Sequence, residues 1–441
     1  MRSLGSSGNG GSGSDCKRGE TSLPPVEASP PRPQQKVALT ICTVEDKSSF
    51  MSPASDNRRR FKIGLIVLLL TPTVLYGIFQ ITGKPPALSG IYVMRRSEPV
   101  PPVSSLNGAS WFSGEFQQSV NAAFSGSFGL RPQFVRLSNQ LYFSFLHRSF
   151  MDNSTIIVGK EGQLYQSPYL LDYSFIRPEN DKQMVGFVDL LERAHEKLTA
   201  RGQMFIYLTS PSKAIWHSET LPDFYQTNAL PGLRRYEMLR PLLSEATIPF
   251  VDAARLTGFA NNDPRDPPFP RGGIHWSDTR AFGATQALVE KLNAVYHRNL
   301  PVPVAESVEY RTENAKEVDA DLSRLLFVLF PPVDYAHSVV HAVPGNGQPG
   351  NKAVYVGSSF SEPVANYLRD CDVFDAVDYY FYYTIEKNRE PLDPSTIDWE
   401  GDILQADAII VESNESALPG DHIIHFLNDL LARIEAEESE K

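Results

Sequence analysis

The chain has 441 residues, and 41% of them are hydrophobic, which is ample for a large packed core. Its formal net charge of −11 argues against a protein that binds nucleic acid or other polyanions over its whole surface. Three cysteines are too few for a disulfide framework, so the fold has to be held by its core.

The first 62 residues differ in composition from the rest of the chain. They open with a run rich in Gly and Ser, continue through a proline-rich stretch and contain almost no aromatic residues. Such a composition buries too little apolar surface to offset the entropy that ordering would cost. We therefore predict a disordered tail over residues 1–62.

An apolar segment follows at residues 63–83. It has no charged residue and is long enough for a helix to cross a bilayer, which takes about 20 residues. Pro72 would kink such a helix, but a kink is tolerated in lipid. Four basic residues crowd the N-terminal flank, whereas only Lys84 follows the segment directly. The positive-inside rule therefore predicts a transmembrane helix with the tail in the cytoplasm and the larger C-terminal part outside.

Residues 84–110 are rich in Pro, Ser and Gly and are predicted to be a linker, and residues 111–441 are predicted to be the outer domain. Residues 1–62 hold 10 of the 41 basic groups and 6 of the 52 acidic groups. The part after the apolar segment therefore holds 31 basic and 46 acidic groups, a net charge of −15. Such a charge is typical of a soluble domain.

Apolar runs and turn signals alternate through the outer domain. Residues 154–166 are predicted to form a hairpin. The other predicted strands are residues 204–210, 248–252, 353–357, 373–383 and 408–412. The predicted helices are residues 179–201, 234–246, 278–296, a segment from about 361, and 420–435. Strand and helix alternate, and several strands are continuous apolar runs. This pattern is typical of an α/β fold with a parallel sheet covered by helices on both faces.

The segment AVYVGSSFSEPVANYL places a serine, Ser359, at a turn between a strand and a helix. Ligands of open α/β folds bind at this edge of the sheet, where such a serine is exposed. Its hydroxyl can attack a carbonyl, and backbone N–H groups near the helix start can stabilise the oxyanion. The alternative is that these serines only form the turn and cap the helix.

A nucleophilic serine needs a base, and His275 is the best candidate among the nine histidines. It lies on a loop just before a predicted helix, whose cap would be Ser277 or Asp278. The loop follows a strand that is expected to end at the same edge of the sheet as Ser359. No His, Cys, Asp and Glu set has the spacing of metal ligands, and no cofactor is expected.

Taken in order, these residues resemble the AlgX/AlgJ group of SGNH-hydrolase-like proteins, which O-acetylate exported polysaccharides such as alginate. The resemblance extends over nearly all of residues 111–435. Its landmarks are FGLR (Phe128–Arg131), IIVGKEGQLY (Ile156–Tyr165), PSK (Pro211–Lys213), IHW (Ile274–Trp276), DLSRLL (Asp321–Leu326), GSSFS (Gly357–Ser361) and ESNE (Glu412–Glu415).

The resemblance implies an SGNH-hydrolase-like, flavodoxin-like sheet in which Ser359 accepts the acyl group and His275 is the general base. It also implies a membrane-bound O-acyltransferase partner that supplies the acetyl group. With the predicted span, this gives a single-pass protein of the cell inner membrane whose outer domain lies in the periplasm.

Two positions depart from the family pattern. The family commonly has an Asp two residues before the histidine, where this chain has Gly273, and Gly-Asp-Ser where this chain has Ser358 before Ser359. A missing carboxylate leaves the histidine tautomer less supported. Either another acid supplies the contact, with Asp278 and Asp252 as candidates, or a backbone carbonyl orients the ring in a Ser-His dyad, or the domain is a non-catalytic glycan-binding scaffold.

Four further residues are candidates for contacts with the substrate or the oxyanion. Lys213, just past a buried strand, would hold an acyl donor or an anionic sugar, or would be a solvated loop lysine. Trp276 would stack on a sugar ring, or would be a core aromatic. Asn414 would reach the site or only end its strand, and Ser358 is the neighbour of the proposed nucleophile.

The predicted function is O-acetyl transfer to an exported polysaccharide through an acyl-enzyme on Ser359. The alternatives are an O-acetyl esterase that uses the same residues with water as the acceptor, and the glycan-binding scaffold. A net charge of −15 would repel a polyuronate at long range, so a neutral glucan is as plausible a substrate as alginate.

Overall fold

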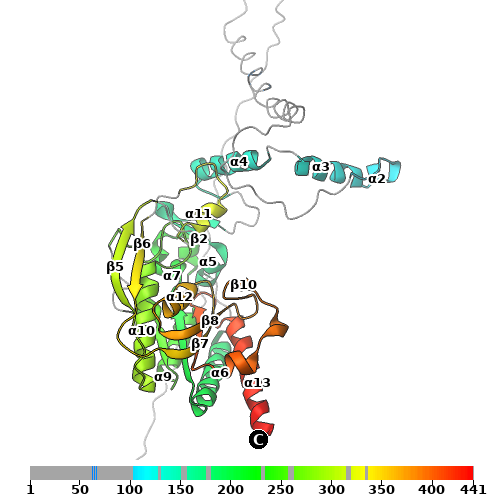
Figure 1. Cartoon of the computed structure of the whole chain (residues 1–441). Helices are drawn as coiled ribbons and strands as arrows, with labels where there is room; N and C mark the ends of the chain where they lie inside the picture. Colours follow the sequence, from blue (N-terminus) through cyan, green and yellow to red (C-terminus); the bar gives the residue numbers. More distant parts are fainter. Residues whose placement is uncertain are drawn as a thin grey trace, which may run out of the picture. The chain divides into compact units, whose positions relative to one another are not determined.

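Figure 1 shows the computed structural model of the chain, which describes residues 62, 64, 66, 103–127, 131–149, 156–174, 180–229, 234–256, 263–313, 319–332 and 336–440. The predicted tail and the predicted membrane span lie almost wholly outside these residues. Within the described part of the chain, no helix combines the length and the hydropathy needed to cross a membrane. The chain divides into Met1–Thr71 and Pro72–Lys441, and the fold below belongs to the second unit.

Three helices precede the main fold. They are α2 (Gly108–Phe112), α3 (Glu115–Ser127) and α4 (Arg131–Leu146). Helix α2 begins inside the predicted linker, where Asn107 caps it by accepting a hydrogen bond from the backbone N–H of Ser110. Helix α4 is tied to the main fold because the Asn139 amide donates to the backbone carbonyls of Leu326 and Phe327.

A seven-stranded sheet, in the order β10-β9-β8-β7-β11-β3-β4, forms the centre of the domain. Its parallel strands are β3 (Met204–Ser210), β4 (Phe250–Asp252), β7 (Gly350–Gly357), β8 (Phe374–Phe381) and β11 (Ala408–Asn414). Two short antiparallel strands, β9 (Glu386–Lys387) and β10 (Glu390–Pro391), extend one edge. The parallel core confirms the predicted α/β arrangement of apolar strands.

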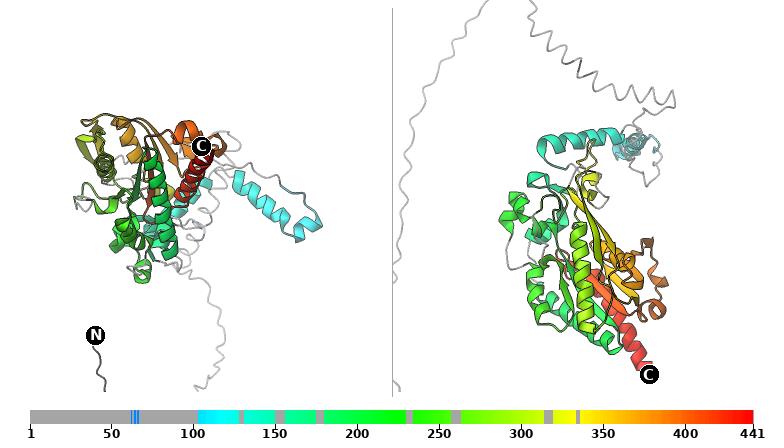
Figure 2. Two further views of the ribbon diagram at one scale, coloured as in Figure 1. Left: turned by 90° about the horizontal axis from the view of Figure 1, so that it is seen from below. Right: turned by 60° about the vertical axis from the view of Figure 1, so that its left-hand side comes forward.

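Helices pack on both faces of this sheet (Figures 1 and 2), because successive strand residues point to opposite sides. Ile206 and Leu208 of β3 pack with α10 (Asp278–Tyr296) and α12 (Glu362–Asp370) on one face. Phe205 and Tyr207 pack on the other face with α6 (Asn180–Ala200), α9 (Arg235–Glu245) and α13 (Asp421–Glu440). Each fully buried large side chain stabilises the fold by roughly 1.5–3 kcal/mol.

The remaining elements are short and lie around this core. They are β1 (Ile156–Val158), β2 (Leu164–Gln166), α5 (Ser167–Ser174), α7 (Lys213–Trp216), α8 (Asp223–Asn228), β5 (Val304–Arg311), α11 (Asp321–Leu325) and β6 (His337–Val343), with single turns at Lys160–Gly162, Ser218–Thr220, Ala253–Arg255, Pro394–Thr396 and Trp399–Ile403. Strands β1 and β2 form the predicted hairpin, with Gly162 at φ 72° in its turn.

Two of the differences from the prediction concern strands. The hairpin of β5 and β6 was not predicted, because β5 is exposed along almost its whole length and carries no apolar run. Strand β8 ends at Phe381 rather than at Tyr383, because Tyr382 and Tyr383 adopt φ values of 44° and 67° that cannot continue a strand. The turn that they form brings Tyr382 back toward the end of β7, where its N–H donates to the Gly357 carbonyl.

Candidate active site

The carboxyl end of β7 forms a tight turn that presents Ser359. The strand ends at Gly357, and α12 begins at Glu362. A Cβ atom at Gly357 would come within 2.2 Å of the Ser361 hydroxyl and 3.0 Å of the Glu412 carboxylate, so a larger residue does not fit. Glycine is therefore required where the strand meets this turn.

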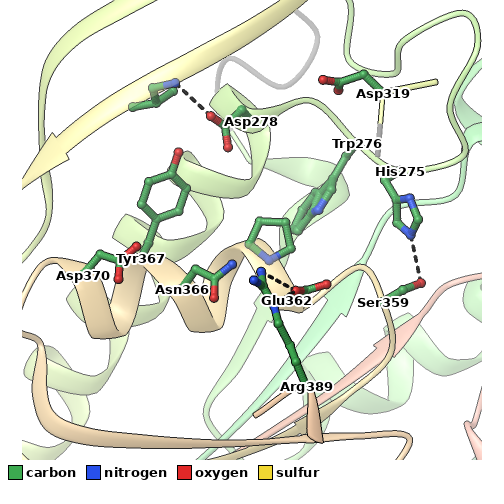
Figure 3. Close-up of a pocket in the computed structure, with 12 residues that line it drawn as sticks. His275, Trp276, Asp278, Asp319, Ser359, Glu362, Asn366, Tyr367, Asp370 and Arg389 are labelled. Atoms are coloured by element: carbon green, nitrogen blue, oxygen red, sulfur yellow. Dashed lines mark hydrogen bonds and ion pairs between the residues drawn. The ribbon is translucent and has the colours of Figure 1, made fainter. Parts of the chain in front are cut away.

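The structure places His275 beside Ser359, although 83 residues separate them in the sequence (Figure 3). The His275 Nε2 atom and the Ser359 Oγ atom are 2.9 Å apart. The histidine precedes α10, and its ring lies 4.9 Å from the ring of Phe360, centroid to centroid. This hydrogen bond is the geometry that a general base and its nucleophile require.

The second ring nitrogen of His275 faces Asp321, at the start of α11. The Asp321 Oδ2 atom lies 3.2 Å from His275 Nδ1. The other carboxylate oxygen accepts from the backbone N–H groups of Ile274 and Leu322, at 3.0 and 2.7 Å, so the carboxylate is fixed on both sides. The approach of Asp321 is an ion-pair contact and not a hydrogen bond, because His275 Nδ1 has no partner of hydrogen-bond geometry in this structure. The negative charge beside Nδ1 favours the tautomer with the proton there, which leaves Nε2 free to accept the serine proton.

The acid that the structure places beside His275 Nδ1 is Asp321, and not Asp278 or Asp252, the two candidates from the sequence. Asp278 Oδ2 accepts from the backbone N–H of Val340 at 2.8 Å. Asp252 accepts from the Tyr236 hydroxyl and lies 3.6 Å from the Arg240 guanidinium. Asp321 opens the DLSRLL landmark, so the resemblance pointed to the segment without giving the residue a role. Gly273 has no carboxylate, but a separate segment supplies one.

Ser358 does not face a substrate; it is buried and holds the turn. Its backbone N–H and its hydroxyl both donate to Glu412 Oε2 at 2.8 Å, and its carbonyl accepts from the hydroxyls of Ser361 and Tyr379 at 2.7 and 2.6 Å. Glu412 also accepts from the Ser210 hydroxyl. Burial raises the pKa of the Glu412 carboxyl, and the hydrogen bonds from Ser210 and Ser358 oppose that shift. Sequence reasoning missed Glu412, which opens the ESNE landmark.

Lys213 is neither a ligand-binding group nor a solvated lysine. It is 1% exposed, and its Nζ atom donates to the carbonyls of Pro270, Arg271 and Gly273 at 2.7, 3.0 and 2.7 Å. These carbonyls belong to the loop that carries His275. Burial lowers the pKa of Lys213 to about 7, while the Asp321 charge acts in the opposite direction.

Trp276 and Asn414 are both buried. The Trp276 Nε1–H donates to the Phe360 carbonyl at 3.0 Å, so the residue after His275 is tied to the residue after Ser359. This favours the core-aromatic interpretation over a stacking platform, although an edge of Trp276 lines the cleft. The Asn414 amide donates to the Pro211 carbonyl at 2.8 Å and to the Ser210 hydroxyl at 3.2 Å, which joins the ends of β11 and β3.

Tyr382 is a further residue at the site that sequence reasoning did not single out. Burial, and then the Glu412 charge, raise the pKa of its hydroxyl, and hydrogen bonds with the side chain and the backbone of Ser359 act in the opposite direction. Its left-handed φ of 44° is uncommon for an aromatic residue, and such strained residues gather at functional sites. Tyr382 belongs to YYFYY, residues 379–383 at the end of the predicted strand 373–383, and alternation along a half-buried strand is enough to explain this aromatic run.

A cleft of about 360 Å³ opens on the serine and the histidine. Helix α12, the start of α10, β6 and the loop between β9 and β10 form its walls (Figure 3). Among the described residues, no group of three or more His, Cys, Asp or Glu side chains is placed to hold a metal ion. The chemistry that this arrangement supports is acyl transfer through a serine hydroxyl.

A parallel sheet with helices on both faces, and with a serine at the end of a central strand hydrogen bonded to a histidine, defines the class of SGNH hydrolase-like domains. Residues 156–369 match the family model described as SGNH hydrolase-like domain, acetyltransferase AlgX. No curated protein matches the chain.

Several solved structures are similar to the chain. The O-acetyltransferase domain of Pseudomonas putida AlgJ is 18% identical, with a TM-score of 0.40, over 60% of this chain and 92% of that one. Pseudomonas aeruginosa AlgX is 13% identical, with a TM-score of 0.37, over 59% and 62%. Bacillus cereus PatB1 is 11% identical, with a TM-score of 0.38, over 60% and 98%.

Proposed function

We propose that this chain is an O-acetyltransferase that moves an acetyl group to a hydroxyl group of a polysaccharide through an acyl-enzyme on Ser359. The observation that carries the proposal is the line of three side chains at the carboxyl edge of the sheet. Ser359 Oγ lies 2.9 Å from His275 Nε2, and His275 Nδ1 lies 3.2 Å from Asp321. The match of residues 156–369 to a family model described by an acetyltransferase supports the same activity.

In the first half of the reaction, Ser359 Oγ attacks the carbonyl carbon of an acetyl donor while His275 Nε2 takes the hydroxyl proton. The tetrahedral intermediate collapses, the bond from the carbonyl carbon to the leaving group breaks, and His275 returns the proton to that group. The Asp321 carboxylate stabilises the imidazolium that forms in between. The product is an acetyl ester of Ser359.

In the second half, a sugar hydroxyl attacks the ester carbonyl and gives its proton to His275. The bond between the carbonyl carbon and Ser359 Oγ breaks, and the proton returns to Ser359. Each tetrahedral intermediate carries an oxyanion. The N–H groups at the start of α12 are placed to donate to it.

The acetyl donor reaches Ser359, in this proposal, from a membrane-bound O-acyltransferase that carries the group across the bilayer. Residues 63–83 would anchor the domain in the cell inner membrane, with the domain in the periplasm. Such a tether raises the effective concentration of the domain near a membrane partner, which an esterase acting in solution would not need.

The scaffold interpretation was motivated by the absence of a carboxylate at Gly273. The carboxylate of Asp321 lies 3.2 Å from His275 Nδ1, which removes that motive. The esterase interpretation uses the same covalent intermediate and differs only in its acceptor, which is water. Transferase and esterase are therefore separated by the product and not by the residues.

The test uses the full-length chain in a mild detergent, with para-nitrophenyl acetate as donor and oligosaccharides as acceptors. Transfer predicts acetylated sugar by mass spectrometry, whereas an esterase gives only free acetate. Ser359→Ala is expected to abolish both products, and Ser244→Ala, an exposed serine on α9, serves as the matched control. Acetylated sugar formed by Ser359→Ala at the wild-type rate would disprove the proposed mechanism.

A further inference from the structure

Helix α4 is attached to the domain through a largely polar face. Arg136 and Asn139 are buried, and the Asn139 amide donates to the backbone carbonyls of Leu326 and Phe327 at 3.0 and 3.3 Å. Phe143, one turn further along the same face, packs against the core. Figure 1 shows the helix at one end of the domain, beside α11. This face fixes the helix, so the opposite face is turned away from the domain.

The opposite face of α4 is apolar and exposed. Leu137, Leu141 and Phe145 follow one another at intervals of four residues, so they lie along one side of the helix. Their exposed fractions are 43%, 50% and 76%. Phe330 is exposed as well, and its backbone N–H donates to the Gln140 side chain at 2.9 Å. A helix on a globular protein normally turns its apolar face inward, so an exposed apolar face of this kind marks an interaction site.

The sequence around α4 carries positive charge without any negative charge. No Asp or Glu occurs between Glu115 and Asp152, whereas 52 of the 441 residues are acidic, so a run of this length would hold about four on average. Arg131 begins α4, and Arg148 is exposed just beyond its end. Basic residues beside an apolar helix face are typical of a helix that lies in the headgroup region of an anionic bilayer.

We propose that α4 docks on the surface of a bilayer with anionic headgroups, with Leu137, Leu141 and Phe145 below the headgroups. The helix has 16 residues, fewer than the roughly 20 that cross a bilayer, so it would lie along the surface. The predicted span at residues 63–83 would bring the domain to the same surface. The docking is a property of α4 and does not depend on acetyl transfer.

Charge argues against two other occupants of this face. A second copy in a twofold contact would place the same surface against itself, so arginines would meet arginines instead of carboxylates. Residues 1–62 carry 10 basic and 6 acidic groups, so the predicted tail has the same sign of charge as the run around α4. Anionic headgroups complement both the charge and the apolar face.

The attachment of α4 also connects the docking face to the active site. Leu326 and Phe327, which accept from Asn139, come directly after α11. Helix α11 begins at Asp321, the acid beside His275. Docking of α4 would therefore hold the segment that carries Asp321 close to the membrane. Under the proposed function, a membrane-bound donor delivers the acetyl group from that side.

The test places the full-length chain in lipid nanodiscs of three parts phosphatidylcholine to one part phosphatidylglycerol, with a nitroxide spin label on Leu141→Cys. Cys16→Ser and Cys42→Ser remove the N-terminal thiols, and Cys371 is buried. Oxygen concentrates in lipid and a neutral nickel complex stays in water, so their collision rates with the label report its depth. We expect the label on Leu141→Cys to collide more with oxygen, and a label on Ser244→Cys, on α9, to collide more with nickel.

Two results would overturn the proposal. One is a label on Leu141→Cys that collides mainly with nickel, because it would show that the face stays in water. The other is a label shielded from both reagents, because it would show that protein covers the face. Spin–spin broadening that disappears on dilution with unlabelled chain would identify that protein as a second copy.

Leu137→Ser with Phe145→Ser tests the apolar face. Both side chains are exposed, so thermal unfolding should stay unchanged, which checks that the fold is intact. Loss of two apolar side chains should move the label on Leu141→Cys from lipid to water. A label that stays in lipid in this variant would contradict docking through this face.

Arg131→Gln with Arg148→Gln tests the charge. Each basic residue near an anionic surface strengthens binding by roughly fivefold, so the ratio of lipid-exposed to water-exposed label should fall roughly 25-fold. Arg193→Gln with Arg265→Gln, two exposed arginines on α6 and in the loop before α10, is the matched control and should leave the ratio unchanged. A fall of the same size in the control would overturn the assignment of the anionic contact to α4.

Discussion

Two loops meet at the active site, and opposite kinds of charge hold them. The histidine loop, residues 270–277, offers backbone carbonyls, which the Lys213 ammonium binds. The serine turn, residues 357–361, offers N–H and O–H groups, which the Glu412 carboxylate accepts. A buried cation thus fixes one loop and a buried anion fixes the other.

The difference follows from what each loop leaves unpaired. A loop that exposes carbonyls to the interior needs a donor with several N–H groups, and an ammonium has three. A turn at a helix start exposes N–H groups, and a carboxylate can accept several of them. A bridge between the loops, from Trp276 Nε1 to the Phe360 carbonyl, sets His275 and Ser359 at a fixed separation. Changes at these contacts test how far each loop depends on its own charge.

The largest effect is expected from Asp321→Asn. The amide retains the size of the carboxylate but presents an N–H group to His275 Nδ1, which favours the tautomer with the proton on Nε2. That tautomer cannot accept the serine proton, so kcat/KM should fall by roughly 10³–10⁴-fold. Asp278→Asn is the matched comparison and should lower kcat/KM by less than about tenfold, because Asp278 accepts from the Val340 N–H while Asp321 is the carboxylate beside His275 Nδ1. A larger loss for Asp278→Asn would disprove the assignment of Asp321.

The sequence predicted most of the sheet and half of the site. Strands such as β3, a run of seven buried residues, are visible as apolar runs because burial on both faces leaves no choice of residue. Ser359 and His275 were found because a strand end and a helix start restrict where such side chains can lie. Asp321 and Glu412 were missed because their partners lie 46 and 54 residues away, and no local pattern records such contacts. Lys213 was misjudged because a buried lysine and a solvated one have the same sequence signature.

Lys213→Met tests whether the histidine loop depends on the buried ammonium. Methionine fills a similar volume but leaves three buried carbonyls without a donor, so the free energy of unfolding should fall by roughly 3 kcal/mol or more. Chemical denaturation measures the change. Lys197→Met, at an exposed ion pair with Glu438, should cost much less, because surface ion pairs contribute little to stability. A similar small cost for Lys213→Met would show that the loop does not depend on the ammonium.

Because the pKa of Lys213 is lowered in the folded state, we expect the free energy of unfolding to depend on pH. Burial lowers the pKa of Lys213 from 10.5 to about 7 in the folded state. Between these two values the unfolded chain binds the proton that the folded chain has lost, so stability rises with pH across this window. The free energy of unfolding of the wild type should therefore rise relative to that of Lys213→Met from pH 7 upward. A constant difference across the window would contradict the lowered pKa.

Glu412→Gln tests whether the serine turn depends on the buried carboxylate. Glutamine presents an N–H₂ group where the carboxylate accepted a hydrogen bond, so one of the contacts to Ser358 or Ser210 becomes a clash between donors. We expect a loss of roughly 2 kcal/mol in stability. Burial raises the folded pKa of Glu412, so this group's contribution is present at low pH and is lost as pH rises above the unfolded value of 4.5. Stability curves against pH for wild type and Glu412→Gln measure the difference.

Glu415→Gln is the matched control for that variant. Glu415 is also buried, with its pKa raised to about 7 by burial, but it accepts from the Ser212 N–H and does not contact the serine turn. Both variants should make the free energy of unfolding less dependent on pH. For Glu415→Gln this change should fall between pH 4.5 and about 7. Only Glu412→Gln should also lower kcat, because only Glu412 holds the turn of Ser359. An equal fall in kcat for both would mean that the effect is general loss of stability.

Trp276→Phe gives the smallest expected effect and tests the bridge between the loops. Phenylalanine retains most of the buried ring but removes the N–H that donates to the Phe360 carbonyl at 3.0 Å. The free energy of unfolding should fall by about 1 kcal/mol, the usual net value of one hydrogen bond. Because the bridge sets the separation of His275 and Ser359, kcat should fall several-fold while KM for the acceptor changes little.

Trp399→Phe, a buried tryptophan stacked on Phe426 on the other face of the sheet, should lower stability without changing kcat. If the two variants lowered kcat equally, Trp276 would be a packing residue and the two loops would be held independently, each by its own charge.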